Sequence, residues 1–147
     1  MFVGYMCSHS SRTKHGEGRI ASETAAWEEA QRIANVQSRI RIGNTKTTLG
    51  LISIALDLFK LKHGRYPRRL IDLSEKPDDI ESKDWPPDGY FREMPLNGWH
   101  HQFVYRYPGT GGRPYDMMSL GMDGREGGEG FDADIPDEKF KILKEKK

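Results

Sequence analysis

The residues best suited to chemistry are carboxylates gathered near the end of the chain. They are separated by glycines and are, in order, Asp123, Glu126, Glu129, Asp132 and Asp134. Clustered carboxylates repel one another unless protons or a cation lie between them. Calcium takes about six to eight oxygens from carboxylates and backbone carbonyls, and glycines let the backbone turn its carbonyls inward. The stretch therefore predicts either a metal-binding loop or a solvated acidic loop.

The residue types in the loop indicate which kind of metal ion it could bind. Residues 119–135 contain no histidine or cysteine, which favours a hard cation over zinc. The spacing does not follow the D-x-[DN]-x-[DN]-G order of an EF-hand. A pair of carboxylates could also serve a glycosidase or a nuclease, but that chemistry needs a cleft and supporting groups from elsewhere in the chain. Because the chain is small and the loop lies near its end, no catalytic residue is predicted.

The histidines and the single cysteine offer no further site. The histidines are His9, His15, His63, His100 and His101, and none stands in a motif with serine or cysteine. The adjacent pair His100 and His101 would point to opposite faces of a strand, which argues against a shared metal site. Cys7 alone forms no internal disulfide and no zinc pattern. We expect surface or strand-edge roles for these side chains.

Length and charge limit the class of protein. The 147 residues correspond to about one domain. The 23 basic and 22 acidic residues nearly cancel, so no general attraction to nucleic acid is expected. The longest apolar-rich run, residues 49–56, is far shorter than the roughly 20 residues that span a bilayer. With a mean hydropathy of −0.77, the chain is expected to be soluble as given, with no visible export signal.

Helical periodicity dominates the first half of the chain. Leu49, Ile52, Leu56 and Phe59 recur at helical spacing, and Ile33, Val36 and Ile40 do so in a more polar stretch. We predict a helix over residues 22–63, with Ser22 as the N-cap and Gly64 as the stop. Gly43 and Gly50 predict a bend or a frayed stretch inside it.

A second apolar stripe runs beside the first in the later half of this helix. It consists of Leu51, Ile54, Ala55 and Leu58. A helix that is apolar around so much of its circumference is expected to be surrounded by other structure.

The second half of the chain predicts a small antiparallel sheet. Residues 101–107 alternate, with Phe103, Tyr105 and Tyr107 on one face, and residues 115–121 form a second strand signal. The turn-rich segment 108–114 joins them as a hairpin. Residues 68–75 predict a short helical turn. Core filling is expected of the aromatic residues Trp85, Tyr90, Phe91, Trp99, Phe103, Tyr105 and Tyr107.

These elements give an α+β fold in which one long helix lies on the sheet. Residues 1–21 are predicted to be a disordered or loose N-terminal segment. Residues 22–138 form the domain, with the helix over 22–63 and the loops and sheet over 64–138. Residues 139–147 are predicted to be a charged, solvated tail.

Four segments of the chain occur in the order typical of one known family. They are ALDLFKLKHGRYP (55–67), YFREMPLNGWHHQFVYRYPG (90–109), YDMMSLGMDGREGGEG (115–130) and DADI (132–135). Over about residues 40–135 the chain resembles the major pseudopilin of type II secretion, general secretion pathway protein G. The resemblance implies a type IV pilin-like fold: a long N-terminal helix packed on a small antiparallel sheet, with a C-terminal metal-binding loop.

The resemblance also implies a ligand set for calcium. Carried over by motif, the ligands are the carboxylates of Asp123, Asp132 and Asp134 and the carbonyl of Leu120, with a further carbonyl near Gly130. Glu126 and Glu129 fall in an insertion of variable length and are not expected to bind the ion.

The function that the resemblance implies is structural and involves no reaction. The chain would be a filament subunit in a periplasmic pseudopilus that exports proteins. Its partners would be other pseudopilin subunits, both copies of itself and minor pseudopilins, and the inner-membrane platform of the secretion system. Contact with the membrane would be made only through an N-terminal segment.

Two departures from the family pattern keep an alternative open. The chain as given does not show the family's prepilin peptidase site, a glycine before an FTLIE-like start, or the apolar segment that follows it. In addition, Asn97-Gly98-Trp99-His100 replaces the usual DPWG. The alternative is a soluble pilin-like binding or adhesion module that does not polymerise.

Overall fold

The computed structural model describes residues 14–140, with side chains described for residues 18–139. Cys7 and most of the predicted tail 139–147 lie outside the described residues. The chain divides into two compact units, Met1–Gln37 and Ser38–Lys147, and each is considered by itself. In the described part of the chain, no helix is long and apolar enough to cross a membrane.

Helix α1 runs from Lys14 to His63. Its start contradicts the prediction of a helix from residue 22, since residues 14–21 are helical. The rest of the predicted loose segment, residues 1–13, lies outside the described residues. Ser22 is not an N-cap, because its hydroxyl donates within the helix to the carbonyl of Arg19 at 2.8 Å. In the first unit every described side chain over residues 18–37 is exposed, so this stretch of helix depends on local helix-forming preference and not on packing within the unit.

The later part of α1 is regular up to its end. The helix is continuous through Gly43 and Gly50, so the predicted fraying is wrong. It ends at His63 as predicted. Gly64 adopts a φ of +73°, and its N–H donates to the carbonyl of Lys60 at 2.8 Å. This left-handed residue closes the last turn, as glycine commonly does at this position.

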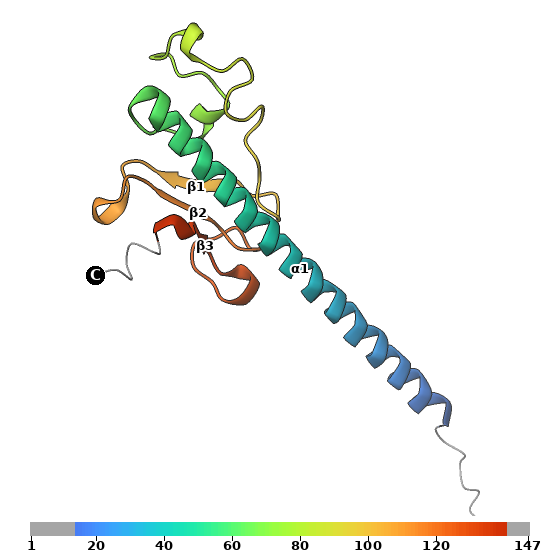
Figure 1. The fold of residues 1–147 in the computed structure, drawn as a ribbon. Coiled ribbons are helices and arrows are strands. Elements are labelled where there is room, and N and C mark those ends of the chain that lie inside the picture. The colour runs from blue at the N-terminus through green and yellow to red at the C-terminus, as the bar shows by residue number, and fades with distance from the viewer. Residues whose placement is uncertain (1–13, 141–147) are drawn as a thin grey trace, which may run out of the picture. The chain divides into compact units, whose positions relative to one another are not determined.

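A three-stranded antiparallel sheet lies beside the later part of α1 (Figure 1). Its strands are β1 (Phe103–Arg106), β2 (Asp116–Ser119) and β3 (Ile135–Pro136), in the order β1-β2-β3. The predicted hairpin is confirmed, with Phe103 opposite Ser119 and Arg106 opposite Asp116, although both strands are shorter than predicted. Strand β3 was not predicted, because two residues show no periodicity.

Short 3-10 helices make up much of the remaining chain. The predicted helical turn is confirmed as η1 (Leu70–Leu73). The others are η2 (Ser82–Asp84), η3 (Thr110–Gly112), η4 (Gly130–Asp132) and η5 (Glu138–Phe140). Helix η4 and strand β3 close the acidic loop, whose other end leaves β2.

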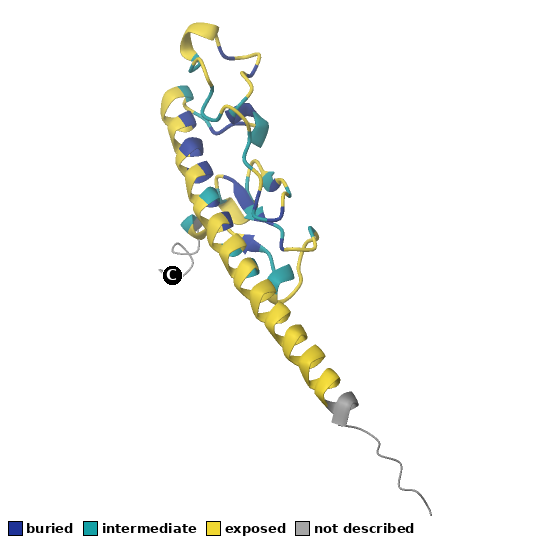
Figure 2. Cartoon of the chain, turned by 90° about the vertical axis from the view of Figure 1, so that its right-hand side faces the viewer, coloured by how far each residue is buried: buried dark blue, intermediate teal, exposed yellow. Residues whose placement is uncertain are grey.

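The core lies between one face of α1 and the sheet, as the dark-blue residues of Figure 2 show. The helix contributes the predicted stripe of Leu49, Ile52, Leu56 and Phe59, all buried. Tyr115 of the segment before β2 is fully buried, and its hydroxyl lies 3.1 Å from the Ser53 hydroxyl. Burial raises the pKa of Tyr115 far above its ordinary value, so the ring remains a neutral core residue.

The aromatic prediction is confirmed with one exception. Trp99 and Phe103 are buried, and Trp85, Tyr90, Phe91 and Tyr105 pack against the core while partly exposed. Tyr107 is 40% exposed, because β1 ends at Arg106 and the strand alternation does not continue to residue 107.

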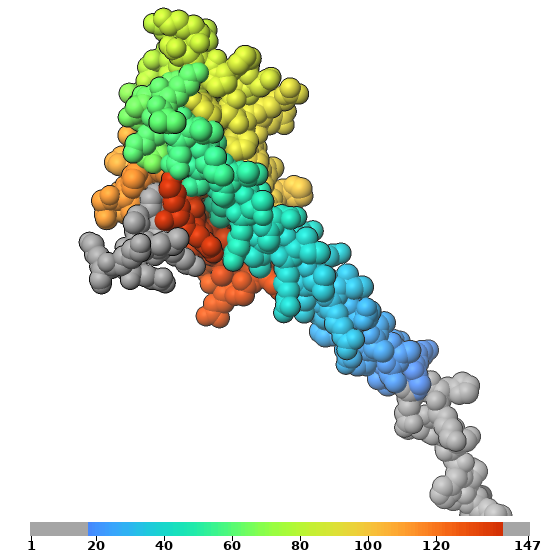
Figure 3. Space-filling model, viewed as in Figure 1, coloured from blue at the N-terminus to red at the C-terminus, as the bar shows by residue number. Residues whose placement is uncertain are grey.

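The second apolar stripe of α1 contradicts the sequence prediction. Leu51, Ile54 and Leu58 are 53%, 58% and 51% exposed, and only Ala55 of this set is buried. Three short strands and their loops cover one side of the helix and leave the other side bare (Figures 2 and 3). The segment around η5 contacts α1 through the ion pairs Lys139–Asp57 and Glu138–Lys46. Among the described residues of the second unit, nothing covers this apolar helix face.

Candidate metal-binding loop

The acidic loop comprises residues 120–134 and connects β2 to β3. Its two limbs meet near their base, where the Met122 N–H donates to the Phe131 carbonyl at 2.9 Å. At Gly121 the limbs approach so closely that an added Cβ would lie 2.1 Å from the carbonyl oxygen of Asp132. No side chain fits in that space, so glycine is required there by the close approach of two backbones.

The three predicted aspartates have different surroundings. Asp123 Oδ1 accepts the Arg125 N–H at 3.0 Å, and Asp134 Oδ2 accepts the Gly127 N–H at 2.9 Å. In contrast, Asp132 Oδ1 and Asp134 Oδ1 are buried and have no hydrogen-bond partner. A buried carboxylate oxygen without a donor is destabilising, and a cation would compensate it. These two oxygens fit a hard cation such as calcium.

The described residues do not by themselves form a complete site. Within residues 14–140, no three histidine, cysteine, aspartate or glutamate side chains are arranged to hold a metal ion. The predicted carboxylates of Asp123, Asp132 and Asp134 are thus not gathered into one cluster. The Leu120 carbonyl already accepts two hydrogen bonds, from Asn97 Nδ2 at 3.0 Å and from Ser119 Oγ at 2.9 Å. Because a carbonyl has two lone pairs, it could bind an ion only by giving up one of these bonds.

The two glutamates of the loop, Glu126 and Glu129, are exposed. Glu126 accepts a hydrogen bond from the guanidinium of Arg106, the last residue of β1, at 2.6 Å. Both partners are about half exposed, so this ion pair contributes little to stability. It does tie the tip of the loop to the sheet.

The turn over residues 97–101 supports the loop and was not predicted to do so. Asn97 is 4% exposed, and its side chain makes four hydrogen bonds. Its Oδ1 accepts the N–H groups of Trp99 and His101, both at 2.9 Å. Its Nδ2 donates to Ser119 Oγ at 2.8 Å and to the Leu120 carbonyl. The amide uses its full capacity and joins the turn to the base of the loop.

The same turn is attached to α1 at Gly98. The Gly98 N–H donates to Thr45 Oγ1 at 2.9 Å. A Cβ at Gly98 would lie 2.6 Å from the Arg41 carbonyl oxygen, so the turn touches the helix backbone directly. Residues 97–100 therefore form an ordered turn although they depart from the DPWG pattern. The His100 N–H closes this turn by donating to the Asn97 carbonyl at 3.0 Å.

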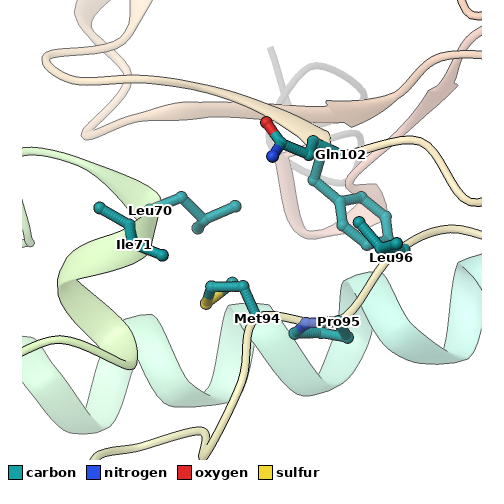
Figure 4. Close-up of a pocket in the computed structure, with 7 residues that line it drawn as sticks. Leu70, Ile71, Met94, Pro95, Leu96 and Gln102 are labelled. Carbon is teal, nitrogen blue, oxygen red and sulfur yellow. The ribbon is translucent and has the colours of Figure 1, made fainter.

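An apolar pocket and a polar depression also lie on the surface of the second unit. An apolar pocket of about 140 Å³ lies between η1 and β1 (Figure 4). It is lined by Leu70, Ile71, Met94, Pro95, Leu96, Gln102 and Phe103, which include no acid, base or nucleophile. At the end of α1, His63 lines a polar depression with Arg65 and Asp79. Its ring bonds the Tyr90 hydroxyl at 3.0 Å, and burial lowers its pKa, which indicates a packing role.

Comparison with known proteins agrees with this geometry. The family model for type II secretion system protein G matches residues 32–138. The chain belongs to the type II secretion system protein G family. The type II secretion core protein G of Pseudomonas aeruginosa is 42% identical over 94 residues, covering 61% of this chain and 66% of that protein. The Vibrio cholerae core protein G is 37% identical over 92 residues, covering 60% and 62%.

A solved structure supports the fold of this family member. The major pseudopilin from the type 2 secretion system of enterohaemorrhagic Escherichia coli matches with a TM-score of 0.55 and 28% identity. The match covers 67% of this chain and 87% of that one. The α+β prediction of a long helix packed on a small antiparallel sheet is confirmed, as is the predicted resemblance to the major pseudopilin of type II secretion. The chain spans just under two thirds of the length of the first two relatives.

Proposed function

We propose that this chain is a structural subunit of a type II secretion pseudopilus. The observation that carries the proposal is the open apolar face of α1. Leu51, Ile54, Leu58 and Leu61 follow one another at intervals of three and four residues, and Leu61 is 84% exposed. Residues at this spacing lie along one line of a helix. The opposite line of the same helix forms the core, so this face is free to pack against another subunit.

Burial of the apolar side chains on this face would favour assembly. Burying one leucine or isoleucine side chain completely contributes about 1.5 to 3 kcal/mol. A contiguous exposed apolar surface with charged neighbours is typical of protein–protein contacts. Asp57, Lys60 and Lys62 are the charged neighbours here, and all three are exposed. Other pseudopilin subunits, including copies of this chain, are the proposed partners, with the inner-membrane platform as the assembly base in the periplasm.

Two lysines on the open face should abolish assembly and leave the fold intact. In Ile54→Lys/Leu58→Lys both substituted side chains are more than half exposed, so the melting temperature should change little. Filaments sheared from cells that produce the chain with its secretion system should disappear, and export should stop. Leu96→Lys, at a 45% exposed leucine that is not part of α1, is the control and should assemble. Normal filaments from the double variant would contradict the proposal, while a folded wild-type chain that never assembles would favour a non-polymerising binding module.

We further propose that the loop binds calcium through Asp132 and Asp134, with Asp123 and the Leu120 carbonyl as further ligands. The support is the pair of buried aspartate oxygens without donors. A bound cation would neutralise these charges and fix the two limbs together. An ordered loop would reduce the entropy lost when subunits assemble.

Calcium should raise the melting temperature of the chain, and EDTA should lower it. Asp134→Ala removes one of the buried oxygens and should abolish the calcium shift. Glu129→Ala, at an exposed residue that is not a proposed ligand, should keep the full shift. Differential scanning calorimetry with millimolar calcium or EDTA makes the comparison. Unchanged melting of the wild type under both conditions would rule out a stabilising calcium site.

A further inference from the structure

His101 lies directly before β1 and contacts the first limb of the acidic loop. Its Nε2 is 3.2 Å from the Met122 carbonyl oxygen. A Cβ at Gly124 would lie 3.0 to 3.2 Å from three atoms of the same ring, so the imidazole rests against this glycine. Because a carbonyl only accepts, Nε2 carries the proton in this contact. The ring thus contacts the residues on both sides of Asp123.

The backbone of His101 is itself firmly held. Its N–H donates to Asn97 Oδ1 and its carbonyl accepts the Asn97 N–H, both at 2.9 Å. Asn97 is buried, whereas Met122 and Asp123 are exposed. The loop contains glycines with positive φ, among them Gly124, Gly127 and Gly128. Glycine has large conformational freedom when nothing else holds the backbone. The ring of a residue with a fixed backbone therefore contacts a loop segment whose ordering would otherwise cost much conformational entropy.

We propose that His101 is a positioning residue for the candidate calcium loop. It holds Met122 and Gly124, and with them Asp123, in the conformation that receives the cation, before the cation arrives. His101 bonds the backbone and does not bind the metal. The inference rests on the calcium binding proposed above, and it assigns to one of the two adjacent histidines a role that the other does not share.

Two substitutions separate the hydrogen bond from the ring packing. His101→Phe keeps a ring over Gly124 and loses the donor, and His101→Gln retains an N–H donor at similar reach. His100→Asn is the matched control, since His100 is exposed and has a φ of +66°, which asparagine tolerates. A hydrogen bond that preorganises a loop is expected to change affinity about three- to tenfold.

Calorimetric titration of the full chain with calcium chloride tests the proposal. His101→Phe should bind calcium about three- to tenfold more weakly, while His101→Gln and His100→Asn should stay within about twofold of the wild type. In metal-free protein, amide hydrogen exchange of residues 122–125 should be faster in His101→Phe than in His100→Asn. A merely structural role would change the melting temperature without this local change in exchange.

The outcomes distinguish the two proposals. A wild type that does not bind calcium removes the metal proposal and this inference with it. A wild type that binds calcium, together with His101→Phe of equal affinity and equal exchange, overturns the positioning role alone. Equal weakening in all variants, the His100→Asn control included, also overturns it, because the effect would then be general destabilisation. If His101→Phe fails to fold, the same comparison with His101→Gln and His101→Ala decides.

Discussion

Replacing Gly121 with alanine is expected to separate the two limbs of the acidic loop and to abolish calcium-dependent stabilisation. The new Cβ would lie 2.1 Å from the Asp132 carbonyl oxygen and 2.2 Å from its carbon. Both are backbone atoms, so no side-chain rotation relieves the clash. The limbs must move apart, which breaks the hydrogen bond from Met122 N to the Phe131 carbonyl and displaces Asp132. Overpacking of this kind costs about 1 to 3 kcal/mol, and occasionally more.

Gly127→Ala in the same loop is the matched control for this steric effect. Gly127 has a φ of +96°, but an added Cβ would meet nothing within 4 Å. Its substitution introduces backbone strain of about 1 to 3 kcal/mol without forcing the limbs apart. Urea unfolding with calcium and with EDTA measures both variants. Both variants should lose some stability, but Gly121→Ala should also lose the calcium response, whereas Gly127→Ala should keep it. A calcium response of wild-type size in Gly121→Ala would show that the limbs need not touch.

The main elements could be predicted from sequence because their signals are local. The stripe from Leu49 to Phe59 has helical spacing, and Gly64 ends the helix by its own left-handed conformation. The hairpin between β1 and β2 joins two apolar runs through a turn-rich segment. Strand β3 could not be predicted in this way, because its two residues form a strand only through pairing with β2.

The exposure of the second apolar stripe on α1 could not be predicted from sequence for a different reason. Leu51, Ile54 and Leu58 have the composition of core residues, and composition does not tell which molecule covers them. A helix face buried within one chain and a helix face buried between subunits have the same sequence pattern. The prediction that other structure surrounds this half of the helix was wrong for the single chain. We propose that neighbouring subunits supply the cover in the assembled pseudopilus.

The acidic residues of the loop could be found from sequence, whereas the residues that support it could not. Asp132 and Asp134 stand out as carboxylates among glycines. Asn97 is 23 positions from Leu120, and His101 is 21 positions from Met122, so both contacts depend on the fold. An Asn-Gly pair indicates a turn but does not indicate what the amide will bind.

Replacing Asn97 with alanine should be among the most destabilising single changes in the described fold. It would leave the buried N–H of Trp99 and the N–H of His101 without their acceptor and Ser119 Oγ without its donor. Each buried polar group left unpaired costs about 1 to 3 kcal/mol. We expect a total loss of about 3 to 5 kcal/mol, a large share of the roughly 5 to 15 kcal/mol that stabilises a domain. Thermal and urea unfolding measure it. Asn44→Ala, at an exposed position on α1, should change stability by less than about 0.5 kcal/mol.

The substitution Asn97→Asp separates the contribution of the amide oxygen to stability from that of the amide nitrogen. Aspartate is also the residue that the family's DPWG pattern has at this position. Aspartate keeps both acceptor contacts, to the N–H groups of Trp99 and His101, and loses the two bonds that Nδ2 donates. Its charge would also face the Leu120 carbonyl, so stability should fall between those of the wild type and Asn97→Ala. With its Nδ2 bond removed, that carbonyl has a free lone pair for a cation. Calcium should therefore restore more stability to Asn97→Asp than to the wild type. An equal calcium shift in both proteins would indicate that Leu120 is not a ligand.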